Sequence, residues 1–411
     1  MGTSKAGYVA LFLQGVAALL PWNVFITAEG YFADRLRDTS VHDSFLTWFS
    51  MAFNLTAFVV LGLNTVVLRA YLPRPSVKIN LSLVGIALVV LVSTVLVKTP
   101  SIQGMVFFNM TMVSIVIAAI CAVYLQEGLF ELTASFPEIY TQAIMTGQSL
   151  AGFLVALSAF IITWTHLDPK VFPLLTWAIT DRESSAFSYF LTAFFTIIVA
   201  IIAFAAFLRS SVAKFYMKTN PDIDAISQTL LDDDEAKKGK TTLNPAKILW
   251  LVRYDAAVVF LTFLVTLAIF PVLTSAIQST NPNKTFQALF TPLSYVLFNG
   301  GDLLGRIFAG CAPRAFSGLT LLVLAILRLG FFPLFAMCNL RTNGGVFKND
   351  AYPIAFIIVC SFTNGLFVSL AMMHSVHHVA PHQREIAGAL MFFCLTFGLT
   401  AGSFASFGVL H

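Results

Sequence analysis

Charge is scarce in this chain. Aspartate, glutamate, lysine and arginine make up 11% of the 411 residues, whereas a soluble domain carries roughly 25%. This shortage excludes a soluble globular protein, which must cover its surface with charged groups. Hydrophobic residues account for 58% of the chain and the mean hydropathy is +0.84. The composition therefore indicates a polytopic membrane protein whose outer surface faces lipid.

The cysteine content and the net charge are also low. The first argues against a metal site or a disulfide framework, and the second against a nucleic-acid partner. The five cysteines are odd in number, sit in apolar runs, and show neither metal-ligand spacing nor the density of a disulfide framework. The formal net charge of +4 gives no indication of a nucleic-acid partner. We therefore expect no cofactor, no bound metal and no nucleic acid, and we look for function among polar residues inside apolar segments.

Long apolar runs fill most of the sequence. About 20 mainly apolar residues are needed to cross about 30 Å of hydrocarbon. By this measure the sequence predicts an all-α protein with eleven transmembrane helices, near residues 8–28, 45–68, 79–97, 105–126, 142–164, 186–208, 256–277, 287–310, 318–338, 352–373 and 386–410.

One connection differs from the others. Residues 209–253 hold an acidic run at 232–235 followed by Lys237, Lys238 and Lys240, with few long apolar side chains. Such a segment is typical of a solvated, disordered linker. We therefore divide the chain into an N-terminal six-helix bundle at 1–208, a cytoplasmic linker at 209–253 and a C-terminal five-helix bundle at 254–411.

Orientation follows from the distribution of lysine and arginine. With the amino terminus in the cytoplasm, the cytoplasmic segments carry the larger share of these residues, mainly because of the linker. Asn283-Lys284-Thr285 is a glycosylation sequon between the seventh and eighth predicted spans. This orientation places the sequon outside, which agrees with a glycoprotein.

The eighth predicted span carries a stripe of polar residues. Spacings of 4, 3 and 4 place Tyr295, Asn299, Asp302 and Arg306 on one face of a helix. A charge inside a membrane costs about 2.5–3.5 kcal/mol on insertion, so charged residues there are functional candidates. Asp302 and Arg306 can offset each other, and together they offer the acceptor and the forked donor that sugar hydroxyls bind. The alternative is a buried ion pair that only locks helices together.

Other residues inside the first, second and fourth predicted spans leave alternatives open. Trp22 follows the helix-bending Pro21 and either stacks on a planar base or marks a membrane interface. Gln126 suits the edge of a heterocycle or an interhelical hydrogen bond. Asn54 and Asn64 lie near opposite faces of the second span, so at most one of them faces a cavity.

Two further features favour structural interpretations. His374, His377, His378 and His382 have spacings that could ligate a metal, but they fall in a short connection that we interpret as a solvated loop. Arg328 lies in the middle of a predicted span and is interpreted as a paired structural charge.

Several short motifs together resemble one family. They are Leu19-Leu-Pro-Trp-Asn23, Phe298-Asn-Gly-Gly-Asp-Leu-Leu-Gly-Arg306, Thr363-Asn-Gly365, Glu385-Ile-Ala-Gly388 and Gly398-Leu-Thr-Ala-Gly402. In this order and within eleven spans, the chain resembles the equilibrative nucleoside transporters over nearly its whole length. The resemblance implies a major-facilitator-like fold of six plus five helices, with a central site between two halves that rock against each other.

The resemblance also implies roles for individual residues. The arginine matching Arg306 contacts the ribose, and the aspartate matching Asp302 braces that arginine. The glutamine matching Gln126 reads the nucleobase. The implied cavity positions are completed by Leu19, Trp22, Asn54, Tyr295 and Asn299.

One position bears on the substrate class. The organic-cation-handling branch of the family carries glutamate in the Thr-Gly-x-Ser segment of the fifth span, where this chain has Gln148. The sequence therefore favours neutral nucleosides such as adenosine and uridine, moved by facilitative transport across the plasma membrane, with a lysosomal or vacuolar membrane as the alternative.

Two rival functions remain open at this stage. Proton-coupled nucleoside or nucleobase transport would use Asp302, Glu127 or Glu131 as a proton carrier, although Arg306 lies four residues from Asp302 and argues against that role. A membrane-embedded enzyme is disfavoured, because no serine or cysteine nucleophile is paired with the histidines.

Overall fold

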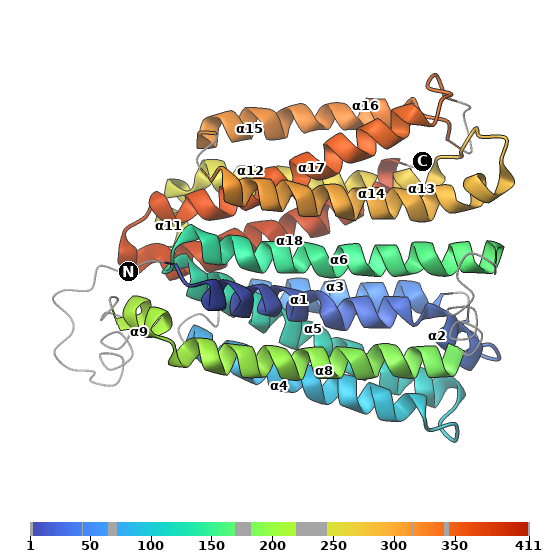
Figure 1. Ribbon diagram of the computed structural model, residues 1–411, viewed down its shortest axis with the longest axis horizontal. Coiled ribbons are helices and arrows are strands. Elements are labelled where there is room, and N and C mark those ends of the chain that lie inside the picture. The colour runs from blue at the N-terminus through green and yellow to red at the C-terminus, as the bar shows by residue number, and fades with distance from the viewer. Residues whose placement is uncertain are drawn as a thin grey trace.

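Long helices run side by side through the whole molecule (Figure 1). The computed structural model describes residues 3–42, 44–64, 72–168, 182–218, 245–313, 316–340 and 345–409. The first half contains α1 (Lys5–Thr27), α2 (Glu29–Arg35), α3 (Phe45–Leu63), α4 (Pro75–Val97), α5 (Gly104–Ala134), α6 (Glu138–Leu167), α8 (Arg182–Arg209) and α9 (Ser211–Lys218). The second contains α11 (Pro245–Leu251), α12 (Arg253–Ile269), α13 (Val272–Ala276), α14 (Lys284–Cys311), α15 (Gly318–Leu327), α16 (Phe331–Ala336), α17 (Ala351–His374) and α18 (Arg384–Val409), with 3₁₀ turns η4 (Arg328–Gly330), η5 (Ser375–His377) and η6 (Pro381–Gln383).

The predicted all-α membrane fold is confirmed, and ten membrane spans are supported. Ten of the described helices, counting α12 with α13, α15 with α16, α17 with η5 and η6 with α18 as single spans, are long and apolar enough to cross a membrane. The predicted eighth span, α14, is not among them. It has 28 residues, so its length suffices, but its polar residues lower its hydropathy below that of the others.

Helix neighbours divide along the sequence. Helix α1 packs on α6 and α8, and α5 packs on α3 and α4; later in the chain, α12 packs on α15, α17 and α18, and α14 packs on α17. The main contacts between these two groups are made by α14 against α6 and by α18 against α5. The polar stripe of α14 therefore belongs to a helix that lies between the groups.

Glycines allow the closest of these approaches. A Cβ atom on Gly15 or Gly147 would collide with backbone of the facing helix in the α1–α6 pair, and one on Gly305 or Gly365 would do so in the α14–α17 pair. Small residues at helix interfaces are typical of membrane proteins, because they let two backbones approach closely. Helices α6 and α14 are thus each fixed to a partner within their own group.

The described ends of the predicted linker are helical. Helix α9 occupies residues 211–218 and α11 occupies 245–251. The acidic and basic runs of the linker prediction lie outside the described residues.

Candidate functional site

Asp302 is the centre of the polar site on α14. Its Oδ2 accepts hydrogen bonds from Arg306 Nε at 2.8 Å and from Ser149 Oγ of α6 at 2.6 Å. Its Oδ1 accepts one from Asn364 Nδ2 of α17 at 2.6 Å. The carboxylate is buried and has three donors from three helices, so the predicted pair of Asp302 with Arg306 is confirmed.

Arg306 joins the two groups of helices. Its Nη1 donates to the backbone oxygen of Met145 on α6 at 3.1 Å. Gln142 Nε2 donates to the Arg306 backbone oxygen at 3.3 Å, and Tyr8 of α1 donates to Gln142 Oε1 at 3.0 Å. The side chain of Arg306 is therefore held by its own helix and by the opposite group.

The remaining residues of the predicted stripe are half-buried. Asn299 Nδ2 donates to the Tyr295 backbone oxygen at 2.9 Å, and its Oδ1 lies against Gly152 of α6. The ring of Tyr295 stands nearly perpendicular to that of Phe270, with centroids 5.2 Å apart. The stripe therefore continues along the α6–α14 boundary away from Arg306.

Two amides meet where α5 and α6 adjoin. Gln148 Nε2 donates to Gln126 Oε1 at 3.0 Å, which confirms an interhelical hydrogen bond as one role of Gln126. The pair is neutral, and a glutamate at residue 148 would place a fixed negative charge here.

Of the predicted site residues, Leu19 and Trp22 lie on α1 and Asn54 lies on α3. Leu19 and Trp22 are half-buried, and the Trp22 ring lies 4.9 Å from that of Phe53. Asn54 is exposed, and its Nδ2 donates to the Ser50 backbone oxygen at 2.9 Å within the same helix. The structure brings Trp22 of α1 together with Phe53 of α3, whereas the hydrogen bonds of Asn54 go to Ser50 on its own helix.

A second buried charged cluster was missed in the sequence. Lys78 Nζ lies 2.5 Å from Glu131 Oε2 and 3.6 Å from Glu127 Oε2, and Asn64 Nδ2 donates to Glu127 Oε2 at 2.9 Å. Helix α4 begins at Pro75, three residues before Lys78, whereas hydropathy begins the span only after it. Glu127 and Glu131, two of the three carboxylates considered as proton carriers, therefore have a cationic partner in Lys78.

Arg328 has neutral partners instead of the predicted ionic one. Its guanidinium donates to the Cys360 backbone oxygen at 2.7 Å, to Thr266 Oγ1 at 2.7 Å and to Thr363 Oγ1. No carboxylate among the described residues lies within ion-pair distance of it.

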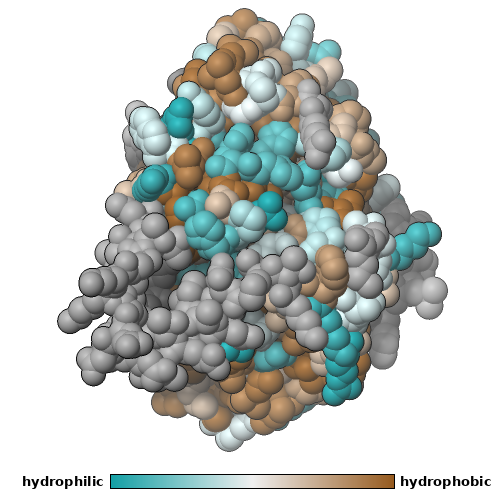
Figure 2. Space-filling view, turned by 90° about the vertical axis from the view of Figure 1, so that its left-hand side faces the viewer, coloured by the Kyte–Doolittle hydropathy of each residue, from teal (hydrophilic) through white to brown (hydrophobic). Residues whose placement is uncertain are grey.

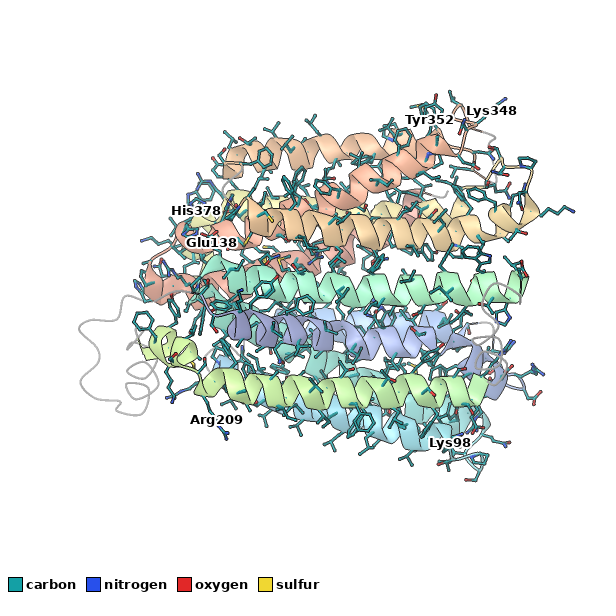
Figure 3. All side chains as sticks on the ribbon, viewed as in Figure 1. Lys98, Glu138, Arg209, Lys348, Tyr352 and His378 are labelled. Carbon is teal, nitrogen blue, oxygen red and sulfur yellow. The ribbon has the colours of Figure 1, made fainter. Side chains whose placement is uncertain are left out.

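His377 and His378, in the connection between α17 and α18, lie at one end of the bundle, where Figure 3 labels Glu138 and His378. His377 Nε2 lies 2.8 Å from Glu138 Oε1, and His378 Nε2 lies 3.3 Å from Asp255 Oδ2. Burial, and then the nearby His374 and His377, lower the pKa of His378. His377 and His378 remain about half exposed, as a solvated connection predicts.

A cavity opens at the same end. It has a volume of about 580 Å³, and its lining includes Phe136, Glu138, Tyr216, His377 and Arg384. Figure 2 shows this end of the molecule, where hydrophilic side chains gather between apolar surfaces. Because Glu138 begins α6 and Arg384 begins α18, the cavity lies between the two groups of helices.

Solved structures identify the architecture. The chain superposes on the E. coli fucose:proton symporter with a TM-score of 0.61 and 11% identity, covering 98% of this chain and 95% of that one. It superposes on the human organic anion transporter MFSD10 with a TM-score of 0.61 and 14% identity, covering 100% and 95%. The protein is therefore a polytopic membrane protein with a major-facilitator-like fold.

Sequence comparison identifies the family. The profile of the nucleoside transporter family matches residues 112–411. Equilibrative nucleoside transporter 2 of Rattus norvegicus is 32% identical, with 97% of this chain and 95% of the relative covered. Equilibrative nucleoside transporter 1 of Homo sapiens is 32% identical, with 98% and 96% covered. The chain belongs to the equilibrative nucleoside transporter family, and it is a transporter rather than an enzyme.

Proposed function

We propose that this protein carries neutral nucleosides across the plasma membrane by facilitative transport with alternating access. The observation that carries the proposal is the position of Asp302, which accepts hydrogen bonds from Ser149 in the first group of helices and from Asn364 in the second. If residues 1–208 and 254–411 rock against each other, the Ser149–Asp302 contact between the two groups must break and re-form, whereas the Asn364–Asp302 contact moves with the second group. A ligand bound at Asp302 is therefore coupled to the motion.

The hydrogen-bonding groups suit a ribose. Ser149 and the Met145 carbonyl occupy Asp302 and Arg306 in the structure, and ribose hydroxyls can replace both because a hydroxyl donates and accepts. Gln126, with Gln148 beside it, supplies amide groups for the base edge. We assign the lining of the cavity to Tyr295 and Asn299 on α14, and the family resemblance adds Leu19, Trp22 and Asn54 from α1 and α3.

We further propose that α14 also crosses the membrane, which raises the number of spans from ten to eleven. At 1.5 Å per residue its 28 residues extend about 42 Å, more than the hydrocarbon thickness of about 30 Å. It packs between α6 and α17, so its polar side chains face protein. The two ends of the chain lie at opposite ends of the bundle, as an odd number of crossings requires (Figure 1).

The direct test is uptake of radiolabelled adenosine and uridine into proteoliposomes. We expect saturable uptake that equilibrates without an ion gradient, with an affinity of roughly −8 to −4 kcal/mol, that is, micromolar to millimolar. Arg306→Ala should lower uptake efficiency at least about tenfold, because hydrogen bonds to charged groups contribute about 1.5–3 kcal/mol. Arg209→Ala is the matched control, since Arg209 is exposed at the end of α8.

Two outcomes would contradict the proposal. Uptake that requires an imposed pH gradient would replace it with proton-coupled transport. Absence of adenosine and uridine uptake by correctly folded wild-type protein would refute the substrate assignment.

A further inference from the structure

Arg328 is buried without an ionic partner at a break in its helix. The 3₁₀ turn η4 separates α15 from α16, and Arg328 begins that turn. The residue is 2% exposed, and its Nε has no hydrogen-bond partner among the described residues. Burial of a charge without an ionic partner has a high free-energy cost. We therefore look for a function that Arg328 could serve at this position.

Hydrogen bonds lead from Arg328 to the site. Arg328 Nη2 donates to Thr266 Oγ1 of α12 at 2.7 Å, and Thr266 Oγ1 donates to Asn364 Oδ1 of α17 at 2.8 Å. Asn364 Nδ2 then donates to Asp302 Oδ1 at 2.6 Å. Thr266, Asn364 and Asp302 are all buried, so water does not compete for these bonds.

The four residues Arg328, Thr266, Asn364 and Asp302 form a chain of hydrogen bonds, which we call the relay. The chemistry of these groups fixes the direction of each hydrogen bond in it. A guanidinium has only donors, so the Thr266 oxygen must accept from Arg328 and direct its single proton elsewhere. That proton selects the oxygen of the Asn364 amide, which leaves the amide nitrogen facing Asp302. The amide is thereby held with a donor, rather than an acceptor, against the carboxylate.

We propose that Arg328 is a positioning residue for the transport site, acting through Thr266 and Asn364 to fix the orientation of Asp302. The inference rests on the proposed function, because it assumes that Asp302 and Arg306 bind the ribose. It goes beyond that function by assigning specificity for ribose hydroxyls to residues that do not touch the ligand. Loss of the relay lets the Asn364 amide turn and leaves Asp302 with one donor fewer.

The test breaks the relay at its middle. Thr266→Val keeps the shape of the side chain but removes the hydroxyl, whereas Thr266→Ser keeps the hydroxyl. Thr262→Val is the matched control, because Thr262 lies one turn earlier on α12, is buried, and has a hydroxyl without a hydrogen-bond partner among the described residues. Each variant is reconstituted in proteoliposomes, and KM and maximal rate are measured for uridine and for 2′,3′-dideoxyuridine.

The expected result is specific to the ribose hydroxyls. Thr266→Val should raise the KM for uridine about tenfold while changing that for dideoxyuridine little, so discrimination between the two substrates falls. Thr266→Ser and Thr262→Val should stay within about twofold of wild type. If Thr266→Val does not fold, Thr266→Ala makes the same comparison with a smaller side chain.

Other outcomes would overturn the inference. Equal effects of Thr266→Val and Thr262→Val would show that the relay does not act on the site. A lower maximal rate for both substrates with unchanged discrimination would assign Arg328 a structural role only. Wild-type protein that transports neither substrate would instead refute the proposed function, and the inference with it.

Discussion

The Lys78 cluster allows a quantitative prediction about stability. Lys78 lies between Glu127 and Glu131, with side-chain exposures of 2%, 2% and 12%. Removing one partner of a buried ion pair costs about 3–5 kcal/mol, because the remaining charge is left without compensation. Lys78→Met removes the charge and keeps most of the apolar stem, so we expect a loss of this size.

Helix α4 supplies a control of the same residue type at its other end. Lys98 Nζ lies 2.9 Å from Glu183 Oε1, but these side chains are 46% and 45% exposed (Figure 3 labels Lys98). An exposed ion pair contributes only about 0–1 kcal/mol. Lys98→Met should therefore change stability little, although the ion-pair distance is similar.

Thermal unfolding of detergent-solubilised protein, followed by the loss of the monodisperse peak in size-exclusion chromatography, compares the two variants. Lys78→Met should unfold at a clearly lower temperature than Lys98→Met. Adding Glu127→Gln and Glu131→Gln to Lys78→Met should recover most of the loss, since no buried charge is then left alone. Equal unfolding temperatures for the two single variants, or no recovery in the triple variant, would refute the reasoning.

Two more predictions concern the substrate and the topology. Gln148→Glu should increase uptake of a permanently cationic N-alkylpyridinium riboside relative to uridine, about tenfold or more, because a carboxylate replaces the neutral amide beside Gln126. The control is Gln148→Met, which loses the hydrogen bond without gaining charge. An equal change in both variants would exclude the charge as the cause. Thr285→Ala should abolish a glycosidase-sensitive mass shift in glycosylating cells while leaving the helix cap intact, because Asn283 Oδ1 accepts from the backbone N–H groups of Thr285 and Phe286. A wild-type protein without that shift would contradict the predicted outward position of the loop.

The parts of the site that can be predicted from the sequence are those that depend on local spacing along one helix. Asp302 and Arg306 are four residues apart on one helix, so helical periodicity alone brings them together. Ser149 and Asn364 complete the same site from α6 and α17, and no periodicity relates residues that are 153 or 62 positions from Asp302. Both residues belong to motifs that are visible in the sequence, but their role as donors to Asp302 depends on tertiary packing.

Hydropathy does not predict a membrane span correctly where the span contains charged or polar residues. Hydropathy places Lys78 outside the span at 79–97 because a lysine ends an apolar window, although Glu127 and Glu131 offset its charge inside the helix bundle. In α14 the same effect is larger, since the stripe that forms the site also lowers the hydropathy of the helix. Ionic partners cannot be read from a window along one segment, because they come from other helices.

If Asp302 and Arg306 bind the ribose as proposed, their protein partners also explain how the carrier can return without its ligand. A buried guanidinium or carboxylate with unmet hydrogen bonds costs several kcal/mol, which would hold an empty transporter in one state. Here Ser149 and the Met145 carbonyl satisfy Asp302 and Arg306. A ribose that replaces these contacts exchanges one set of hydrogen bonds for another, so its net binding energy stays small. The proposed site therefore predicts moderate affinity and reversible flux in both directions from the same protein groups.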